Sequence, residues 1–360
     1  MIHLLMLVNI RYIMGSYGNG IGVGGRGLFE FPAIFFYLIP MIKKENIDLK
    51  AKWYDYFFLL RPILWVPVWV FLFLGYAYGA RLEFMKIHLL LPRKFWFVLI
   101  AFTMLMSSVY VINQIVDKES DRINEKLFLI PYEIISVRSA LIVSVLLALS
   151  ALILSYFLGG FVLFLLFFVS LVLGLLYSLP PFHFKARPFL DFIVNGLGYA
   201  CVALLVGWYT TENLNLHALV VSFGYFILVC AIFINTTIPD IPGDKKTGKI
   251  TTGVFLGNRL SLILSSSLFI LALIYAFLEM DLLVVVPSLL GAIFSILALW
   301  DNTEDMIITK LSYRVPSFIF ILLVSIKFPI FLVINLVLLF VLRKYYKARF
   351  GLDYPAMLGR

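Results

Sequence analysis

The chain has 360 residues, of which 62% are hydrophobic and only 14% are charged, and its mean hydropathy is +1.02. Soluble domains carry about 25% charged residues, so this composition excludes a disordered chain and argues against a soluble two-domain enzyme. The formal net charge is +9. Because the basic residues stand between apolar runs, anionic lipid headgroups explain them, and we expect no nucleic-acid partner.

The first 49 residues differ from the rest of the chain. They contain a glycine-rich run from Gly18 to Gly27 and no coherent membrane span. We interpret residues 1–49 as an N-terminal extension that is flexible or follows from a misassigned start, because Met41 opens a more conventional beginning. Residues 50–350 are then the transmembrane domain.

Charge-free runs predict the membrane-spanning helices, because a span needs about 20 apolar residues. Asp, Glu, Lys and Arg are all absent from Ser139 to Phe184 and from Asn213 to Pro239. The predicted helices cover residues 56–80, 92–116, 139–157, 160–179, 190–210, 216–238, 260–278, 282–300 and 315–342. The fold class is therefore all-α, a polytopic bundle of about nine spans.

The last predicted segment is longer than one span requires and contains Lys327 and Pro329. We interpret it as one kinked helix, which gives nine spans. A break at Lys327 would give ten, and bilayer thickness alone does not decide between the two because helices tilt.

The distribution of basic residues favours one orientation, with residues 43–55 on the cytoplasmic side. The connections near Gly159, Glu212 and Glu279 carry no basic residue and fall outside. Nine spans place the basic tail Arg343–Arg349 outside as well, whereas ten spans would place it inside. We expect an integral, multi-pass protein of a prokaryotic cell membrane, with its polar mouth on the cytoplasmic face.

A first polar motif follows the second predicted span, where Asn113, Asp117 and Asp121 stand four residues apart. This spacing stacks three oxygen-bearing side chains on one helix face, about 6 Å apart in rise. Such acceptors at the mouth of a membrane bundle are costly unless a cation neutralises them. Oxygen ligands in this number suit Mg²⁺, which keeps waters and bridges to substrate phosphates.

A second acidic motif, Asp240 and Asp244, follows the sixth predicted span, and neighbouring prolines predict a turn or a short distorted helix there. Asp240 lies 123 residues after Asp117, and Asp244 lies 123 residues after Asp121. Four spans lie between the motifs, so both open at the same membrane face. Either motif alone could be juxtamembrane charge in a solvated loop, but the matched register favours one site.

Basic and hydroxyl side chains near these motifs could bind a diphosphate. The candidates are Arg61, Arg122, Tyr177, Ser178, Lys185, Arg187 and Lys245. Positive-inside charge around a proline turn also explains Lys185 and Arg187. Asp191 could pair with Arg187, four residues before it.

Together these segments resemble the UbiA-type intramembrane prenyltransferase superfamily over roughly residues 50–350. The resemblance rests on Asn113-x-x-x-Asp117-x-x-x-Asp121, on Tyr177-Ser178-x-Pro180-Pro181 followed by Lys185, and on Asp240-Ile-Pro-Gly-Asp244-Lys245-Lys246. The chain departs from the family pattern at Gln114, at Asn124-Glu125-Lys126 and at Thr237.

The resemblance implies a bundle around a central cavity and a Mg²⁺-dependent transfer of an isoprenoid chain. The donor is a prenyl diphosphate, the acceptor is lipophilic, aromatic or other, and both meet within the lipid bilayer. The residues that the resemblance makes catalytic and metal-binding are Asn113, Asp117, Asp121, Asp240 and Asp244. The basic and hydroxyl candidates bind the diphosphate. The variant Asp281→Ala, on the opposite face, should be nearly silent in prenyl transfer.

Two other classes of membrane protein compete with this interpretation. A cation-coupled membrane transporter would use the four aspartates of the two motifs as ion ligands, although clustered lysines at one mouth favour an anionic substrate. A CDP-alcohol phosphotransferase also uses intramembrane aspartates, but its D-G-x-x-A-R segment before G-x-x-x-D-x-x-x-D is missing from this sequence.

Overall fold

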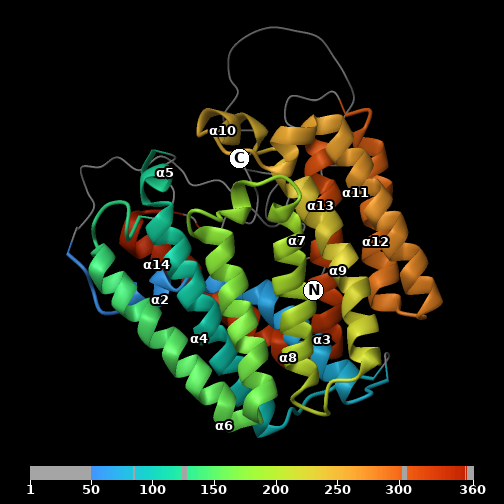
Figure 1. Cartoon of the computed structure of the whole chain (residues 1–360), viewed down its shortest axis with the longest axis horizontal. Helices are drawn as coiled ribbons and strands as arrows, with labels where there is room; N and C mark the ends of the chain where they lie inside the picture. The colour runs from blue at the N-terminus through green and yellow to red at the C-terminus, as the bar shows by residue number, and fades with distance from the viewer. Residues whose placement is uncertain (1–49, 84–85, 124–127, 302–305, 353, 355–360) are drawn as a thin grey trace, which may run out of the picture. The chain divides into compact units, whose positions relative to one another are not determined.

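The computed structural model describes residues 50–83, 86–123, 128–301, 306–352 and 354, and every regular element in these ranges is a helix (Figure 1). The elements are α2 (Asp55–Leu59), η2 (Pro62–Leu64), α3 (Trp65–Gly79), α4 (Arg93–Val116), α5 (Lys118–Ile123), α6 (Val137–Ser178), η3 (Phe184–Ala186), α7 (Leu190–Asn195), η4 (Gly196–Ala203), α8 (Leu204–Trp208), α9 (Leu216–Thr237), α10 (Ile241–Lys246), α11 (Thr252–Leu278), α12 (Leu282–Ala298), α13 (Ile307–Lys327) and α14 (Pro329–Phe350). Residues 1–49 lie outside the described part, so the extension remains a prediction.

Eight helical segments in the described residues are long and apolar enough to cross a membrane. One of them, α6, is two helices joined at Gly159 and Gly160, whose backbone is not helical. The shorter apolar helix α12 adds another segment. The prediction of an all-α, polytopic membrane bundle is confirmed, and the predicted break near Gly159 is where the chain bends.

The outer surface of the bundle is apolar, as expected of helices in contact with lipid. Only 17% of the apolar window in α6 is buried, against 72% in the segment Pro62–Gly79. The exposed side chains of α6 are large and hydrophobic, for example Leu146, Phe157 and Phe161. Since the interior helices are buried on most sides, α3 belongs to the core and α6 to the periphery.

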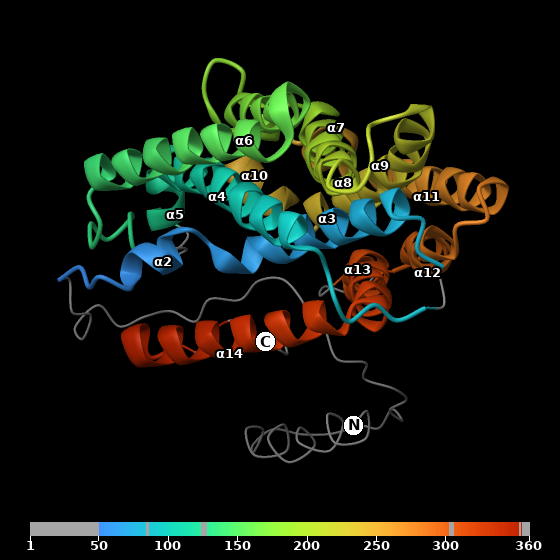
Figure 2. The same cartoon turned by 90° about the horizontal axis from the view of Figure 1, so that it is seen from below.

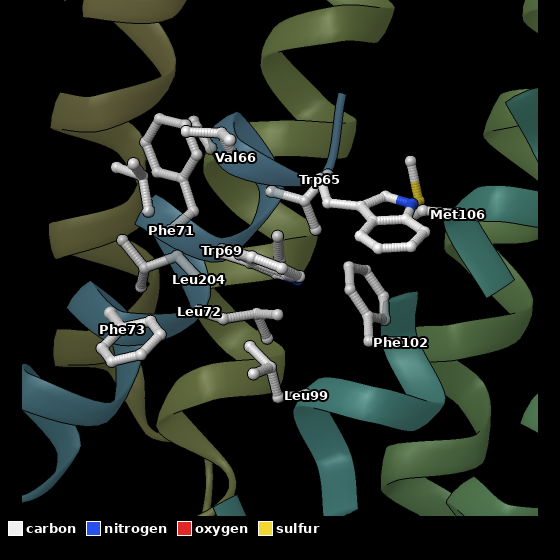
Figure 3. Packing of buried hydrophobic residues seen from close by; sticks show 14 of the residues in the cluster. Trp65, Val66, Trp69, Phe71, Leu72, Phe73, Leu99, Phe102, Met106 and Leu204 are labelled. Atoms are coloured by element: carbon white, nitrogen blue, oxygen red, sulfur yellow. The ribbon is translucent and has the colours of Figure 1, made fainter. Parts of the chain in front are cut away.

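The core forms where α3 meets α4 and α8. In Figure 3 the indole of Trp65 lies beside Met106 and Phe102. Glycines bring α3 and α8 together at backbone distance: a Cβ on Gly75 would lie 1.9 Å from the Leu204 carbonyl oxygen. Small residues at helix contacts are the usual means of close packing in membranes.

The prediction of one kinked helix over 315–342 is wrong. Helix α13 ends at Lys327 and α14 begins at Pro329, and the residue between them, Phe328, has φ −127° and ψ 85°. Proline has no N–H to donate and disfavours helical backbone in the residue before it, which explains the break. Figure 2 shows α13 nearly end-on and α14 lengthwise, so the chain turns sharply there.

Helix α14 then returns to the end of the bundle where the described chain starts. The Arg349 guanidinium donates to the Asp55 carboxylate at 3.2 Å and to the Lys50 carbonyl at 2.8 Å. The basic tail therefore lies beside residues 50–55, as the ten-segment alternative required.

Candidate active site

The two acidic motifs lie at the same end of the bundle. Figure 1 shows α5, which follows the first motif, and α10, which contains part of the second, both at the top of the view. We call this the acidic end. The two motifs therefore lie at the same end of the bundle, as predicted.

The first motif keeps its four-residue stacking although the helix that carries it ends within the motif, at the residue predicted. Helix α4 ends at Val116, and Asp117 is its C-cap. The Asp117 N–H still donates to the Asn113 carbonyl at 3.0 Å, and the Asp121 N–H donates to the Asp117 carbonyl at 2.8 Å. These backbone bonds continue the helical spacing through the cap and into α5.

A cluster of four side chains, Asn113, Asp117, Ser178 and Lys185, forms the centre of the site. The Lys185 ammonium donates to the Asp117 carboxylate at 2.6 Å, and both side chains are largely buried, 9% and 17% exposed. The Asn113 amide is oriented so that its nitrogen donates to the Asp117 carboxylate at 3.2 Å. Its oxygen then accepts from the Ser178 hydroxyl at 3.1 Å and from the Lys185 ammonium at 3.0 Å. We call these four residues the Lys185 cluster.

The surroundings of the Lys185 cluster shift the titration of two groups. Burial lowers the pKa of Lys185, an effect that the Asp117 carboxylate opposes and the Lys249 charge reinforces. Burial, followed by the charge of Lys185, also lowers the pKa of His183. Sequence reasoning missed His183 and Lys249, whose only signal was their place in the connections that flank the motifs.

The second motif stands on a short helix, as predicted. Asp240 is the N-cap residue of α10, and Asp244 lies within that helix. The Thr251 hydroxyl donates to the Asp244 carboxylate at 3.1 Å.

Asp191 joins the two halves of the acidic end. Its buried carboxylate, 1% exposed, accepts from the Thr252 N–H at 2.7 Å and from the Thr252 hydroxyl at 2.5 Å. The start of α7 is thereby fixed to the start of α11. The expected pairing with Arg187 is not what the structure shows, because that guanidinium donates to the Pro181 carbonyl at 2.6 Å.

The other basic candidates differ in their exposure. Arg122, Arg187 and Lys245 are exposed, and the Arg122 charge acts on Glu133. Arg61 is half-buried and stands between α2 and η2, as the N-cap residue of η2.

A third polar stripe enters the bundle on α7 and η4, and sequence reasoning did not identify it. Asp191, Asn195 and Tyr199 again follow at four-residue spacing. The Asn195 amide donates to the Asp191 carbonyl at 2.7 Å, and the hydroxyls of Tyr199 and Tyr110 lie 3.1 Å apart. Tyr199 belongs to a π-helix, a conformation frequent at functional sites. The signal was polar residues at helical spacing inside an apolar run.

Within the described residues, His, Cys, Asp and Glu side chains form no group of three that could hold a metal ion together. Each motif instead offers two carboxylates at the acidic end. Mg²⁺ binds proteins through one or two carboxylates, keeps several waters and takes substrate phosphates as further ligands. The chemistry of the donor set therefore fits Mg²⁺ bound with a diphosphate.

Residues 64–310 match the model of the UbiA prenyltransferase family. The chain is 30% identical over 181 residues to a chloroplastic 2-acyl-4-prenylphloroglucinol 6-prenyltransferase of Humulus lupulus, covering 46% of this chain and 43% of that protein. It is 35% identical over 88 residues to a lycopene elongase/hydratase of Haloarcula japonica, covering 24% and 29%. The matched stretches thus span less than half the length of these relatives.

The fold is similar to that of a UbiA homolog from Archaeoglobus fulgidus whose structure was solved with GPP and Mg²⁺ bound. The TM-score is 0.57 at 23% sequence identity, and the match covers 76% of this chain and 99% of that chain. At this identity the comparison concerns the arrangement of helices.

Proposed function

Because the chain belongs to the UbiA prenyltransferase family, we propose that it transfers an isoprenoid chain from a prenyl diphosphate to a lipophilic acceptor inside the membrane. The observation that carries this proposal is the Lys185 cluster. It holds a cation, a carboxylate, an amide and a hydroxyl within hydrogen-bond distance at the end of an apolar bundle.

Lys185 is the residue best placed for the diphosphate. Its ammonium pairs with the Asp117 carboxylate, and its remaining N–H groups can donate charge-assisted hydrogen bonds to diphosphate oxygens. The Ser178 hydroxyl and the Lys249 ammonium are further donors near the same point. We propose that these groups, with Tyr177 and Arg61, bind the diphosphate.

The transfer breaks the bond between the allylic C1 and the diphosphate oxygen, and the electron pair leaves with the diphosphate. The acceptor supplies the electron pair of the new bond to C1 and afterwards loses one proton. Lys185 stabilises the negative charge that develops on the leaving group, an electrostatic contribution that is often the largest in catalysis. Buried helices around the site exclude the water that would otherwise capture the allylic cation.

Mg²⁺ is the metal that these residues would hold, through Asp117 and Asp121 on one segment and Asp240 and Asp244 on the other, with Asn113 as a neutral oxygen ligand. When bound, it neutralises the diphosphate and makes it a better leaving group. This assignment rests on the donor chemistry and on the shared acidic end.

The acceptor class is open to experiment. The names of the two relatives include an aromatic acceptor and lycopene. Lys118 and Arg122 follow the first acidic motif and Lys245 and Lys246 follow Asp244 of the second, which is consistent with a mouth on the cytoplasmic face. The transporter alternative receives no support from the matched family or from these relatives.

The test is a panel of prenyl diphosphates of different chain length, each combined with an aromatic or a carotenoid acceptor. Membranes containing the protein are incubated with Mg²⁺, and products are identified by mass. The matched control is membranes containing the variant Lys185→Met. A prenylated acceptor formed by the native chain and not by the variant supports the proposal. Solute uptake in proteoliposomes without release of diphosphate would contradict it.

A further inference from the structure

Arg61 adopts a backbone conformation that residues other than glycine rarely adopt. Its φ is 55° and its ψ is 59°, in the left-handed region where the Cβ crowds the following carbonyl. Such a conformation persists only where surrounding contacts impose it, and it is found disproportionately at functional sites. Contacts on either side of Arg61 must therefore hold its backbone in this conformation.

The first anchor comes from Gln114, which follows Asn113 on α4. Its side chain is 3% exposed and donates to the Leu59 carbonyl at 2.8 Å and to the Tyr110 carbonyl at 3.1 Å. Leu59 is the last residue of α2, where carbonyl groups lack partners within the helix. The Gln114 amide thus closes the end of α2, two residues before Arg61.

The second anchor lies on the other side of Arg61 and comes from the same face of α4. The Tyr110 hydroxyl donates to the Leu64 carbonyl at 3.2 Å, at the end of η2. Asn113 of the Lys185 cluster stands between Tyr110 and Gln114 on α4. One stretch of α4 therefore holds both flanks of Arg61 and also supplies part of the site.

A third anchor comes from α14. The Asp55 carboxylate, 0% exposed, accepts from the Tyr345 hydroxyl at 2.8 Å and pairs with the Arg349 guanidinium at 3.2 Å. The Phe58 ring stacks on the Tyr345 ring with centroids 3.4 Å apart. Asp55 and Arg349 both lie outside the residues that match the family model.

We infer that Gln114 is a positioning residue: it holds the segment between α2 and η2, and with it Arg61, from the same stretch of α4 that supplies Asn113 to the Lys185 cluster. This inference rests on the proposed function, in which Arg61 helps to bind the diphosphate. Asp55 fixes the start of α2, on the same side of Arg61 as Leu59.

The chemistry requires an amide at position 114. Gln114 donates both of its hydrogen bonds to carbonyl oxygens. An uncharged N–H₂ group of this reach supplies the two donors that they need. Glutamate has the same shape but, when ionised, presents only acceptors, so Gln114→Glu would face two carbonyls. Gln114→Met keeps the length of the side chain without a polar group and removes the contacts without burying a charge.

The test is a double-mutant cycle in which the dissociation constant of a non-reactive prenyl thiodiphosphate is measured on purified protein with Mg²⁺. Gln114→Met and Gln114→Glu are each made in the native background and in an Arg61→Ala background. In the native background we expect the dissociation constant to rise about tenfold, the size of a typical coupling between neighbouring groups. In the Arg61→Ala background we expect a change of about twofold or less, because the positioned group is already gone.

Asn335→Asp is the matched control, because Asn335 is also a buried amide that donates to a backbone carbonyl, on α14. It should leave the dissociation constant unchanged in both backgrounds. Equal effects of Gln114→Met in the two backgrounds would overturn the inference. No effect of Arg61→Ala alone would also overturn it and would leave the role of the Lys185 cluster standing. Loss of binding in Lys185→Met reports separately on the proposed function.

Discussion

The ammonium group of Lys185 lies 2.6 Å from a carboxylate oxygen of Asp117, although 68 residues of chain separate the two. This contact joins the end of α4 to the connection between α6 and α7. It places a nearly buried cation against the first acidic motif, which neither segment could do alone.

The variant Asp117→Ala should lose transfer activity by about 10²–10³-fold, the loss that follows removal of one group that stabilises a transition state. It leaves the Lys185 charge without its carboxylate and removes a proposed Mg²⁺ ligand. Initial rates with a prenyl diphosphate and Mg²⁺ measure the effect. Glu119→Ala, an exposed acid two residues further on, is the control and should be near normal.

The double variant Asp117→Ala plus Asp244→Ala should be little worse than either single variant, because residues that act as one unit give non-additive losses. Multiplicative losses in the same assay would mean that the two acidic motifs act independently.

Lys185 should set an alkaline limb in the pH profile of kcat/KM for the prenyl diphosphate. Burial lowers the pKa of this ammonium below its usual value near 10.5, and the charged form is the one that binds an anion. Activity should therefore be complete below the folded pKa and fall as the pH rises through it. Because kcat/KM reports on the free enzyme, Lys185→Arg should move this limb to higher pH. A limb unchanged by that substitution would assign it to another group.

The variant Asp191→Ala should destabilise the protein strongly. It leaves the Thr252 N–H and hydroxyl without their acceptor in a buried place, at about 1–3 kcal/mol for each group. The midpoint of thermal unfolding in detergent measures the loss. Glu212→Ala is the control, since its pair with Arg81 is exposed and worth about 0–1 kcal/mol. Equal midpoints for the two variants would contradict the structural role of Asp191.

Asp281→Ala should be nearly silent in prenyl transfer, as its position on the opposite face predicts, but it should lower the stability of the protein. Asp281 is the N-cap of α12 and accepts from the Leu283 N–H at 3.0 Å, and loss of such a cap costs about 0.5–2 kcal/mol. Burial raises the pKa of this carboxyl, and the Tyr78 and Tyr225 hydroxyls oppose that shift. The unfolding midpoint should fall while KM for the diphosphate stays the same.

A chain that begins at Met41 should insert into membranes and keep its activity, because the residues matching the family model begin at position 64. Quantitative immunoblots of washed membranes and rates per inserted molecule provide the measurement. Failure of the shortened chain to insert would show that the first 40 residues belong to the folded domain.

Much of the candidate site followed from spacing along the chain. Asn113, Asp117 and Asp121 are four residues apart, and the backbone bonds between them keep that order in space. The exposed positions of Arg122 and Lys245 were not foreseeable, because nearness to a motif in sequence does not fix the direction of a side chain. The expected partner of Asp191 was wrong for the same reason. Arg187 stands four residues before it, but the carboxylate accepts from the hydroxyl of Thr252, 61 residues away.

The sequence by itself determined the membrane bundle and the shared end of the two acidic motifs. Both are local properties, since about 20 apolar residues suffice for a span and an even number of spans returns the chain to the same side. Only the tertiary structure decided that Lys185 pairs with Asp117, that Gln114 donates to the Leu59 carbonyl, and that α14 returns to Asp55. These contacts join residues 55 to 290 positions apart, and they depend on how whole helices pack, which no local pattern of residues records.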